Sequence, residues 1–133
     1  MEYLYHGSTV SGIKVLEPHK RFTPAAKIEY AAIYASSLPL IAAAHAFPWT
    51  SDEGIDFTIN DGTVVLSVPM ILKDRLNQPI SIYKVSAEKF RLTTEEETGY
   101  TWDTEESIEV LEEILYSSVN QAFRKLGGTI TLI

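Results

Sequence analysis

Cysteine is absent from this chain of 133 residues, which excludes disulfide bonds, zinc–thiolate sites and a cysteine nucleophile. The chain has only three histidines, His6, His19 and His45, and they lack the spacing of metal ligands. We therefore predict that no metal is bound. The glycine-rich phosphate loops, the HExxH motif and the GxSxG motif are missing as well, so the common nucleotide-binding and hydrolase motifs are excluded.

Long apolar runs are also missing. The first eight residues lack the basic start and the apolar run of a signal peptide. The most apolar stretch, residues 31–47, is interrupted by Ser36, Ser37, Pro39 and His45, and it is shorter than a membrane span. The sequence therefore predicts a cytoplasmic protein that makes no contact with a membrane.

Positive charge is scarce. The chain has 11 lysines and arginines against 18 acidic residues, and its formal net charge is −7. An acidic surface opposes non-specific binding to nucleic acids, because such binding needs basic groups that displace counterions. Nine of the 18 acids lie between Glu95 and Glu113, a run that is typical of a solvated face or an exposed loop.

What remains is the composition of an ordinary globular protein, with 45% hydrophobic and 22% charged residues. The length suits one domain with a modest core. There is no internal repeat, linker or low-complexity tract. We therefore predict a single domain over residues 1–133.

Short elements of both kinds are predicted along the chain. Apolar and β-branched patterns predict strands at residues 2–6, 31–36, 80–85 and 129–133, and a hairpin over 55–69 that turns at Asn60-Asp61-Gly62. An alanine-rich helix is expected over 38–47, with Ser37 as its N-cap and Pro39 in its first turn. Residues 19–27, which contain Pro24, are expected to form a loop.

The last quarter of the chain allows two interpretations. Apolar residues recur at helical spacing over 104–126, and Asp103 with Glu106 resembles a capping box, so this stretch reads as one long helix. Alternatively, residues 108–116 form a strand and residues 118–126 a shorter helix. Gly127-Gly128 ends the helix in either case. Since strands outnumber helices and hairpins are present, the predicted fold class is α+β.

Two strand ends carry residues suited to binding a polar ligand. In Tyr5-His6-Gly7-Ser8, Gly7 permits close approach to the backbone, while His6 and Ser8 offer hydrogen bonds and Tyr5 a stacking surface. Tyr34 and Ser36 close the second predicted strand with a similar pair, an aromatic ring and a small hydroxyl residue. The pairing of these two strand ends predicts a shared site.

These motifs resemble those of the ADP-ribosyltransferase fold, in its poly(ADP-ribose) polymerase branch of the His-Tyr-Glu type. The resemblance covers residues 3–47 and rests on Leu4–Ser8, Ile13 and Leu16, Ala32–Ser36 and the alanine-rich helix that follows. It implies split antiparallel β-sheets with a few short flanking helices. The layout of the whole chain is also similar to that of small bacterial and phage proteins that begin Tyr-His-Gly-Ser.

The resemblance implies a role for each matched residue, with NAD as the substrate. His6 matches the histidine that hydrogen-bonds the adenosine ribose, and Gly7 the glycine whose backbone pairs with the nicotinamide amide. Tyr34 matches the tyrosine that stacks on nicotinamide, and Ser36 lies near a serine that contacts the amide. Tyr5 and Ser8 flank this site and complete the predicted NAD-binding set.

The family's catalytic glutamate is not matched, because its position falls near Thr101. Carboxylates near this position are Glu97, Asp103, Glu106 and Glu109. We take Glu109 as the candidate catalytic carboxylate beside His6 and Tyr34. The resemblance also favours strand and helix over one long helix in the last quarter.

Three functions are compatible with these observations. The first is NAD-dependent transfer of ADP-ribose to an unknown acceptor. The second, motivated by Thr101, is a catalytically inactive domain that binds NAD, ADP-ribose or a related nucleotide. The third is an interaction module that has kept the fold alone and uses the acidic segment 95–113 as its partner surface.

Overall fold

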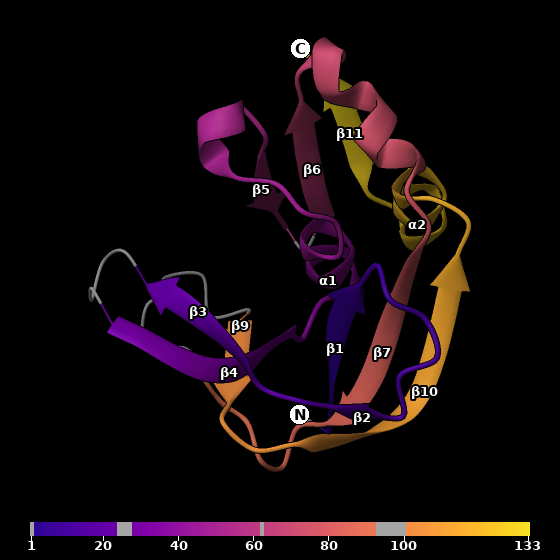
Figure 1. The fold of residues 1–133 in the computed structure, drawn as a ribbon. Helices are drawn as coiled ribbons and strands as arrows, with labels where there is room; N and C mark the ends of the chain where they lie inside the picture. The colour runs from indigo at the N-terminus through magenta and orange to yellow at the C-terminus, as the bar shows by residue number, and fades with distance from the viewer. Residues whose placement is uncertain (1, 24–27, 62, 93–100) are drawn as a thin grey trace.

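The structure is a computed structural model that describes residues 2–23, 28–61, 63–92 and 101–133, with the backbone alone for 19–23 and 28–30. These residues form a mixed α+β fold that consists mostly of antiparallel strands (Figure 1). The strands are β1 (Tyr3–Ser8), β2 (Val15–Leu16), β3 (His19–Thr23), β4 (Ile28–Ser36), β5 (Asp56–Asn60), β6 (Thr63–Val68), β7 (Ile80–Ser86), β8 (Arg91–Leu92), β9 (Thr101–Thr104), β10 (Ile108–Tyr116) and β11 (Thr129–Leu132). The helices are α1 (Pro39–His45) and α2 (Val119–Leu126), with two 3-10 segments, η1 (Ser51–Glu53) and η2 (Met70–Asn77). The α+β prediction is confirmed.

The larger sheet splits at its centre, where two neighbouring strands diverge. Its strand order is β2-β10-β7-β1-β4-β9-β8, with β3 on the edge of β4. Strand β1 pairs with β7 over six positions, but with β4 at the single position Tyr5↔Ser36. In Figure 1, β4 and β3 swing away from β1, whereas β7 and β10 run alongside it. The two halves of the sheet therefore meet at β1 and β4. A smaller sheet, β11-β6-β5, completes the fold, and β11 runs parallel to β6.

Both faces of β7 are buried, which explains its nearly continuous apolar sequence. Ile80 and Ile82 join the core that lies under α1, α2 and the small sheet. Tyr83 and Val85 point to the opposite face, where they join a second core with Leu4. Successive side chains of a strand alternate between faces, so one strand can serve two cores.

Helix α1 packs unusually close to β1 because both elements carry small residues at the contact. Ala42, Ala43 and Ala44 are buried. A Cβ atom added to Gly7 would overlap the carbonyl oxygen of Ala42 and would lie 2.8 Å from the Cβ of Ala46. The absence of a side chain at Gly7 is therefore a packing requirement of the β1–α1 contact.

Glu113 on β10 holds the segment that follows β1 in place through hydrogen bonds. Its carboxylate accepts hydrogen bonds from the Ser81 hydroxyl at 2.6 Å and from the Gly12 backbone N–H at 3.2 Å. The hydroxyl of Tyr83 donates to the carbonyl oxygen of Val10 at 2.5 Å, in the same segment. The hydrogen bonds that Glu113 accepts, the one from Ser81 above all, hold the pKa of its carboxyl group below the usual value of 4.5.

The last quarter contains a strand and a helix, as the second interpretation predicted. Residues 108–116 form β10, which pairs with β7, and α2 begins at Val119 after the N-cap Ser118. The long helix over 104–126 is wrong. The capping box is wrong too, because Asp103 lies within β9. Gly127 ends α2 in a left-handed conformation (φ 83°), as expected.

Two further predictions need correction, while the hairpin of β5 and β6 is confirmed. The N-cap of α1 is Leu38 rather than Ser37, and the side chain of Ser36 accepts the Leu38 N–H at 3.1 Å. Within the expected loop 19–27, residues 19–23 form β3 and pair with β4. Pairing along the edge of β4 supplies the hydrogen bonds that a local pattern cannot predict. Residues 24–27 lie outside the described part of the chain.

Candidate functional site

A pocket of about 200 Å³ opens where β1 and β4 diverge. The lining residues are Tyr5, His6 and Gly7 from β1, Tyr34, Ala35 and Ser36 from β4, Ile41, Ala42 and His45 from α1, and Thr101 from β9. The split of the sheet creates the space, and α1 closes it on one side. The pocket therefore depends on the same β1–α1 contact that requires Gly7.

His6 bridges the gap between the two strands. Its Nδ1 atom lies 2.6 Å from the backbone carbonyl oxygen of Tyr34. A carbonyl oxygen only accepts hydrogen bonds, so Nδ1 must carry the proton. In the neutral ring Nε2 is then the unprotonated nitrogen, which acts as an acceptor. The imidazole thus replaces the ladder hydrogen bonds that end at Tyr5↔Ser36, and it fixes its own orientation.

The pairing of β4 with β9 sets four polar side chains on one face. Tyr34 is directly opposite Asp103, and Ser36 is directly opposite Thr101. Opposite residues of an antiparallel pair point to the same side, as do residues two apart on one strand. Asp103 is buried, and its carboxylate accepts a hydrogen bond from Nε of Arg91 at 3.1 Å. The carboxylate of Asp103, whose charge is balanced by Arg91, therefore lies on the same face as Tyr34 and Thr101.

The structure brings most of the predicted site residues together. These are Tyr5, His6, Gly7, Tyr34 and Ser36, which all line the pocket. Thr101, the position where the resemblance expects a glutamate, lines it as well.

Two predicted site residues lie elsewhere. Ser8 is not among the lining residues, and its hydroxyl accepts the Val10 N–H at 3.0 Å. Glu109 is an exposed residue of β10 that pairs with Val15 of β2. Two strands, β7 and β1, separate β10 from β4. Glu109 is therefore not brought to the pocket, whereas Glu97 falls outside the described residues.

Helix α1 contributes lining residues that the sequence interpretation missed. Ile41, Ala42 and His45 all face the pocket. Their separations of one, three and four positions are those of neighbours on one helix face. This spacing was visible in the sequence, but the face that meets the pocket depends on how α1 crosses β1.

His45 also belongs to an aromatic cluster outside the pocket. Its ring stacks nearly parallel to that of Trp49, with centroids 5.9 Å apart and planes at 14°. Phe57 meets both rings edge-on, at 5.1 Å from His45 and 6.3 Å from Trp49. This geometry suits the quadrupoles of the rings and orders the segment that follows α1.

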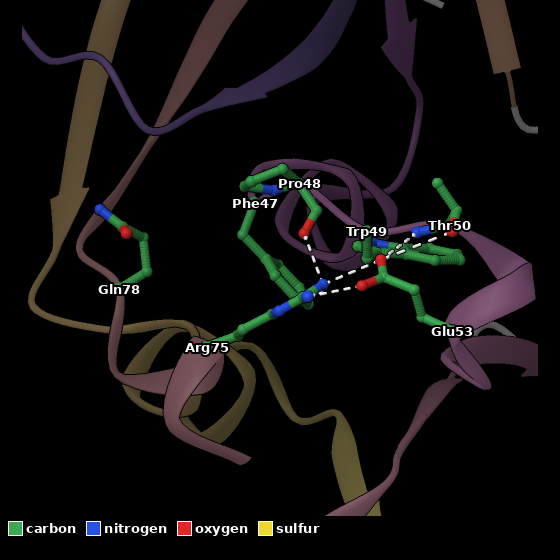
Figure 2. Close-up of a pocket in the computed structure, with 7 residues that line it drawn as sticks. All are labelled: Phe47, Pro48, Trp49, Thr50, Glu53, Arg75 and Gln78. Atoms are coloured by element: carbon green, nitrogen blue, oxygen red, sulfur yellow. Dashed lines mark hydrogen bonds and ion pairs between the residues drawn. The ribbon is translucent and has the colours of Figure 1, made fainter. Parts of the chain in front are cut away.

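A two-point ion pair holds that segment to η2. In Figure 2, the side chain of Arg75 reaches across a hollow below Phe47 and Pro48 to Glu53. The two guanidinium nitrogens donate to the two carboxylate oxygens at 2.9 and 2.5 Å. The hydrogen bond from Arg75 is the largest of the effects that lower the pKa of Glu53 from 4.5 to about 2.

Glu53→Gln is expected to change how stability depends on pH. Because folding lowers the pKa of Glu53, its contribution is complete above pH 4.5 and is lost as the pH falls toward 2. The wild-type protein should therefore be the more stable one near neutral pH, and the two unfolding free energies should converge toward pH 2. Urea unfolding across this range measures both.

The control for this prediction is Asp52→Asn, which removes an exposed carboxylate from the same turn and leaves the ion pair in place. Its unfolding free energy should run parallel to that of the wild type. A constant gap between Glu53→Gln and wild type down to pH 2 would contradict the prediction.

The described residues contain neither a cluster suited to a metal ion nor a helix suited to crossing a membrane. No group of three or more His, Asp or Glu residues in this part of the chain is placed to hold a metal ion. In the same part of the chain, no helix has the length and apolar character needed to cross a membrane.

Comparisons with known proteins gave no match to this chain. This holds for models of protein families, for curated proteins and for solved structures. The residues of the site themselves therefore carry the functional argument.

Proposed function

We propose that the pocket between β1, β4 and α1 binds the nicotinamide end of NAD or of a closely related nucleotide, on an ADP-ribosyltransferase-like split sheet. One observation carries the proposal. His6 and Tyr34 are 28 residues apart in the sequence, yet they line one pocket and are joined by a hydrogen bond. Three further residues that the resemblance assigns to NAD, Tyr5, Gly7 and Ser36, line the same pocket.

The size and lining of the pocket suit a single flat ring. Pockets for drug-sized ligands have volumes of roughly 300–1,000 Å³, so about 200 Å³ leaves room for one ring system and not for a dinucleotide. Tyr34 and His45 offer aromatic faces to such a ring, and Ser36 and Thr101 offer hydroxyl groups to its amide. The rest of the nucleotide then lies outside the pocket.

His6 supplies the polar contact at the pocket mouth in this proposal. The bond to Tyr34 fixes the proton on Nδ1, and the unprotonated Nε2 of a neutral imidazole has the acceptor chemistry that suits a ribose hydroxyl. A ligand hydroxyl is a better match for this acceptor than a second acceptor such as a phosphate oxygen.

A second function, transfer of ADP-ribose from NAD, is favoured by the placement of Asp103. Its carboxylate is buried, directly opposite Tyr34 and two residues beyond Thr101. A carboxylate near the ribose favours the positive charge that develops there as nicotinamide leaves. Arg91 balances the charge of Asp103, so this ion pair would have to open before the carboxylate could stabilise charge on the ribose. We therefore rank binding above transfer.

Thermal unfolding with and without NAD, ADP-ribose and nicotinamide tests the proposal. Each ligand that binds the folded state raises the unfolding temperature, and a concentration of about 100 times Kd stabilises by about 2.7 kcal/mol. His6→Ala should remove the rise for NAD, whereas Glu109→Gln on β10 should keep it. No rise with any of the three ligands would refute binding. Release of nicotinamide by the wild type, lost in Asp103→Asn, would establish cleavage of NAD, and ADP-ribose found on an acceptor rather than free in solution would establish transfer.

A further inference from the structure

Two larger hollows lie along the segment 45–50, and the first of them adjoins the ring pocket. The first, of about 510 Å³, shares His45 with the ring pocket. The second, of about 560 Å³, is the hollow of Figure 2, and it shares residues 47–50 with the first. Residues 45–50 therefore form a wall along all three cavities: His45 lines the ring pocket and the first hollow, and residues 47–50 line both larger hollows.

The wall is aromatic and held in place. The indole N–H of Trp49 donates to the carbonyl oxygen of Ala44 at 2.6 Å, and the ring stacks on His45. Trp49 is half-buried and lines both larger hollows. It thus presents an oriented π face, the surface that attracts a cation most strongly among side chains.

The first hollow is lined by a negative charge, whereas the two charges that line the second hollow balance each other. Among the described residues that line the first hollow, Asp56 is the one carboxylate, and none is a lysine or an arginine. In the second hollow Glu53 stays ionised, and the guanidinium of Arg75 is already bound at two points. The lining of the first hollow therefore repels an anion such as the pyrophosphate of a dinucleotide.

We infer that the hollow between His45, Trp49 and Asp56 binds the cationic side chain of a lysine or arginine from a protein segment. The ammonium or guanidinium group lies over Trp49, and Asp56 balances its charge. The net charge of −7 favours approach of a basic segment over a second copy of this chain. Binding of this segment does not depend on the proposed function. Only a use of the bound segment as the acceptor of ADP-ribose would rest on that function.

A titration with a capped Gly-Gly-Arg-Gly-Gly peptide, followed by NMR, tests the inference. The chain has two tryptophans, so their indole N–H signals are easily assigned with Trp49→Phe. The Trp49 signal should shift and saturate. The Trp102 signal should not, because its indole nitrogen is buried in β9, away from the hollow. The same peptide with Gln in place of Arg is the matched ligand control.

Asp56→Asn is expected to weaken binding of the arginine peptide by up to about five-fold, the range of an exposed ion pair. The asparagine can keep the hydrogen bond that the Asp56 side chain accepts from the Phe57 N–H, so the fold is retained. Glu109→Gln removes the same charge from β10 and should leave the affinity unchanged. Equal weakening by both variants would reduce the effect to net charge and overturn the inference.

The remaining outcomes of the titration also test the inference. Equal shifts with the glutamine peptide, or no saturable shift of Trp49, would overturn the inference. A saturable Trp49 shift caused by inorganic pyrophosphate would do the same, since it would place an anion in the hollow. Because His6→Ala should abolish the response to NAD and leave the arginine peptide bound, failure of this inference and failure of the proposed function are distinguishable.

Discussion

Replacing Gly7 by alanine is expected to destabilise the protein by about 3 kcal/mol and to abolish ligand binding in the adjoining pocket. The new methyl group would overlap the carbonyl oxygen of Ala42, which is main chain and has no rotamer to change. Helix α1 would have to move away from β1, and the helix carries three lining residues of the pocket. Urea unfolding measures the loss of stability, and the thermal response to NAD measures the loss of binding.

Gly12→Ala is the control that separates this clash from the general cost of replacing glycine. Gly12 has a positive φ of 79°, and a Cβ atom there would meet nothing within 4 Å. The expected cost is about 1 kcal/mol, from backbone conformation alone. If Gly7→Ala proved no more costly than Gly12→Ala, the close packing of α1 on β1 would not be a requirement of the fold.

The elements that the sequence predicted well are those with local causes. The hairpin of β5 and β6 forms around Asp61, whose φ of 51° is the conformation that an Asp-Gly turn supplies. The end of α2 at Gly127 is equally local. The stretch 104–126 was ambiguous because Leu111 and Leu115 extended the helical period. Both lie in β10 and are 55% and 63% exposed, so pairing with β7 outweighs the pattern.

The residues of the candidate site also differ in whether the local sequence could identify them. His6 and Tyr34 were identifiable because each lies near the end of a strand that its own local sequence predicts. Which carboxylate lies near them depends on strand order, and no local pattern contains that information. Glu109 is close to Thr101 in sequence, but the order β10-β7-β1-β4 carries it away from the pocket. The sequence predicts Gly7 as a position where a ligand approaches the backbone. The structure shows that the packing of α1 on β1 by itself already requires glycine there.

Tyr34→Ala is expected to weaken NAD binding by about ten-fold or more, whereas Tyr34→Phe should stay within a few-fold of wild type. Stacking of a flat heterocycle on an aromatic side chain contributes about 1–3 kcal/mol, and phenylalanine keeps the ring. Isothermal titration calorimetry with NAD measures all three proteins, and urea unfolding shows whether each remains folded. Tyr3→Ala, which removes an exposed tyrosine of β1 that does not line the pocket, is the control and should bind normally.

The pair of Tyr34 variants separates two ways in which this residue can serve the pocket. The backbone carbonyl of Tyr34 accepts the bond from His6, and no substitution of the side chain removes that acceptor. If Tyr34→Ala folds and binds NAD as well as wild type does, the ring is not a stacking platform, and the residue acts only through its carbonyl. If Tyr34→Phe loses as much affinity as Tyr34→Ala, the hydroxyl group rather than the ring carries the contact. Only retention by phenylalanine with loss by alanine supports a ring-binding pocket at the split between β1 and β4.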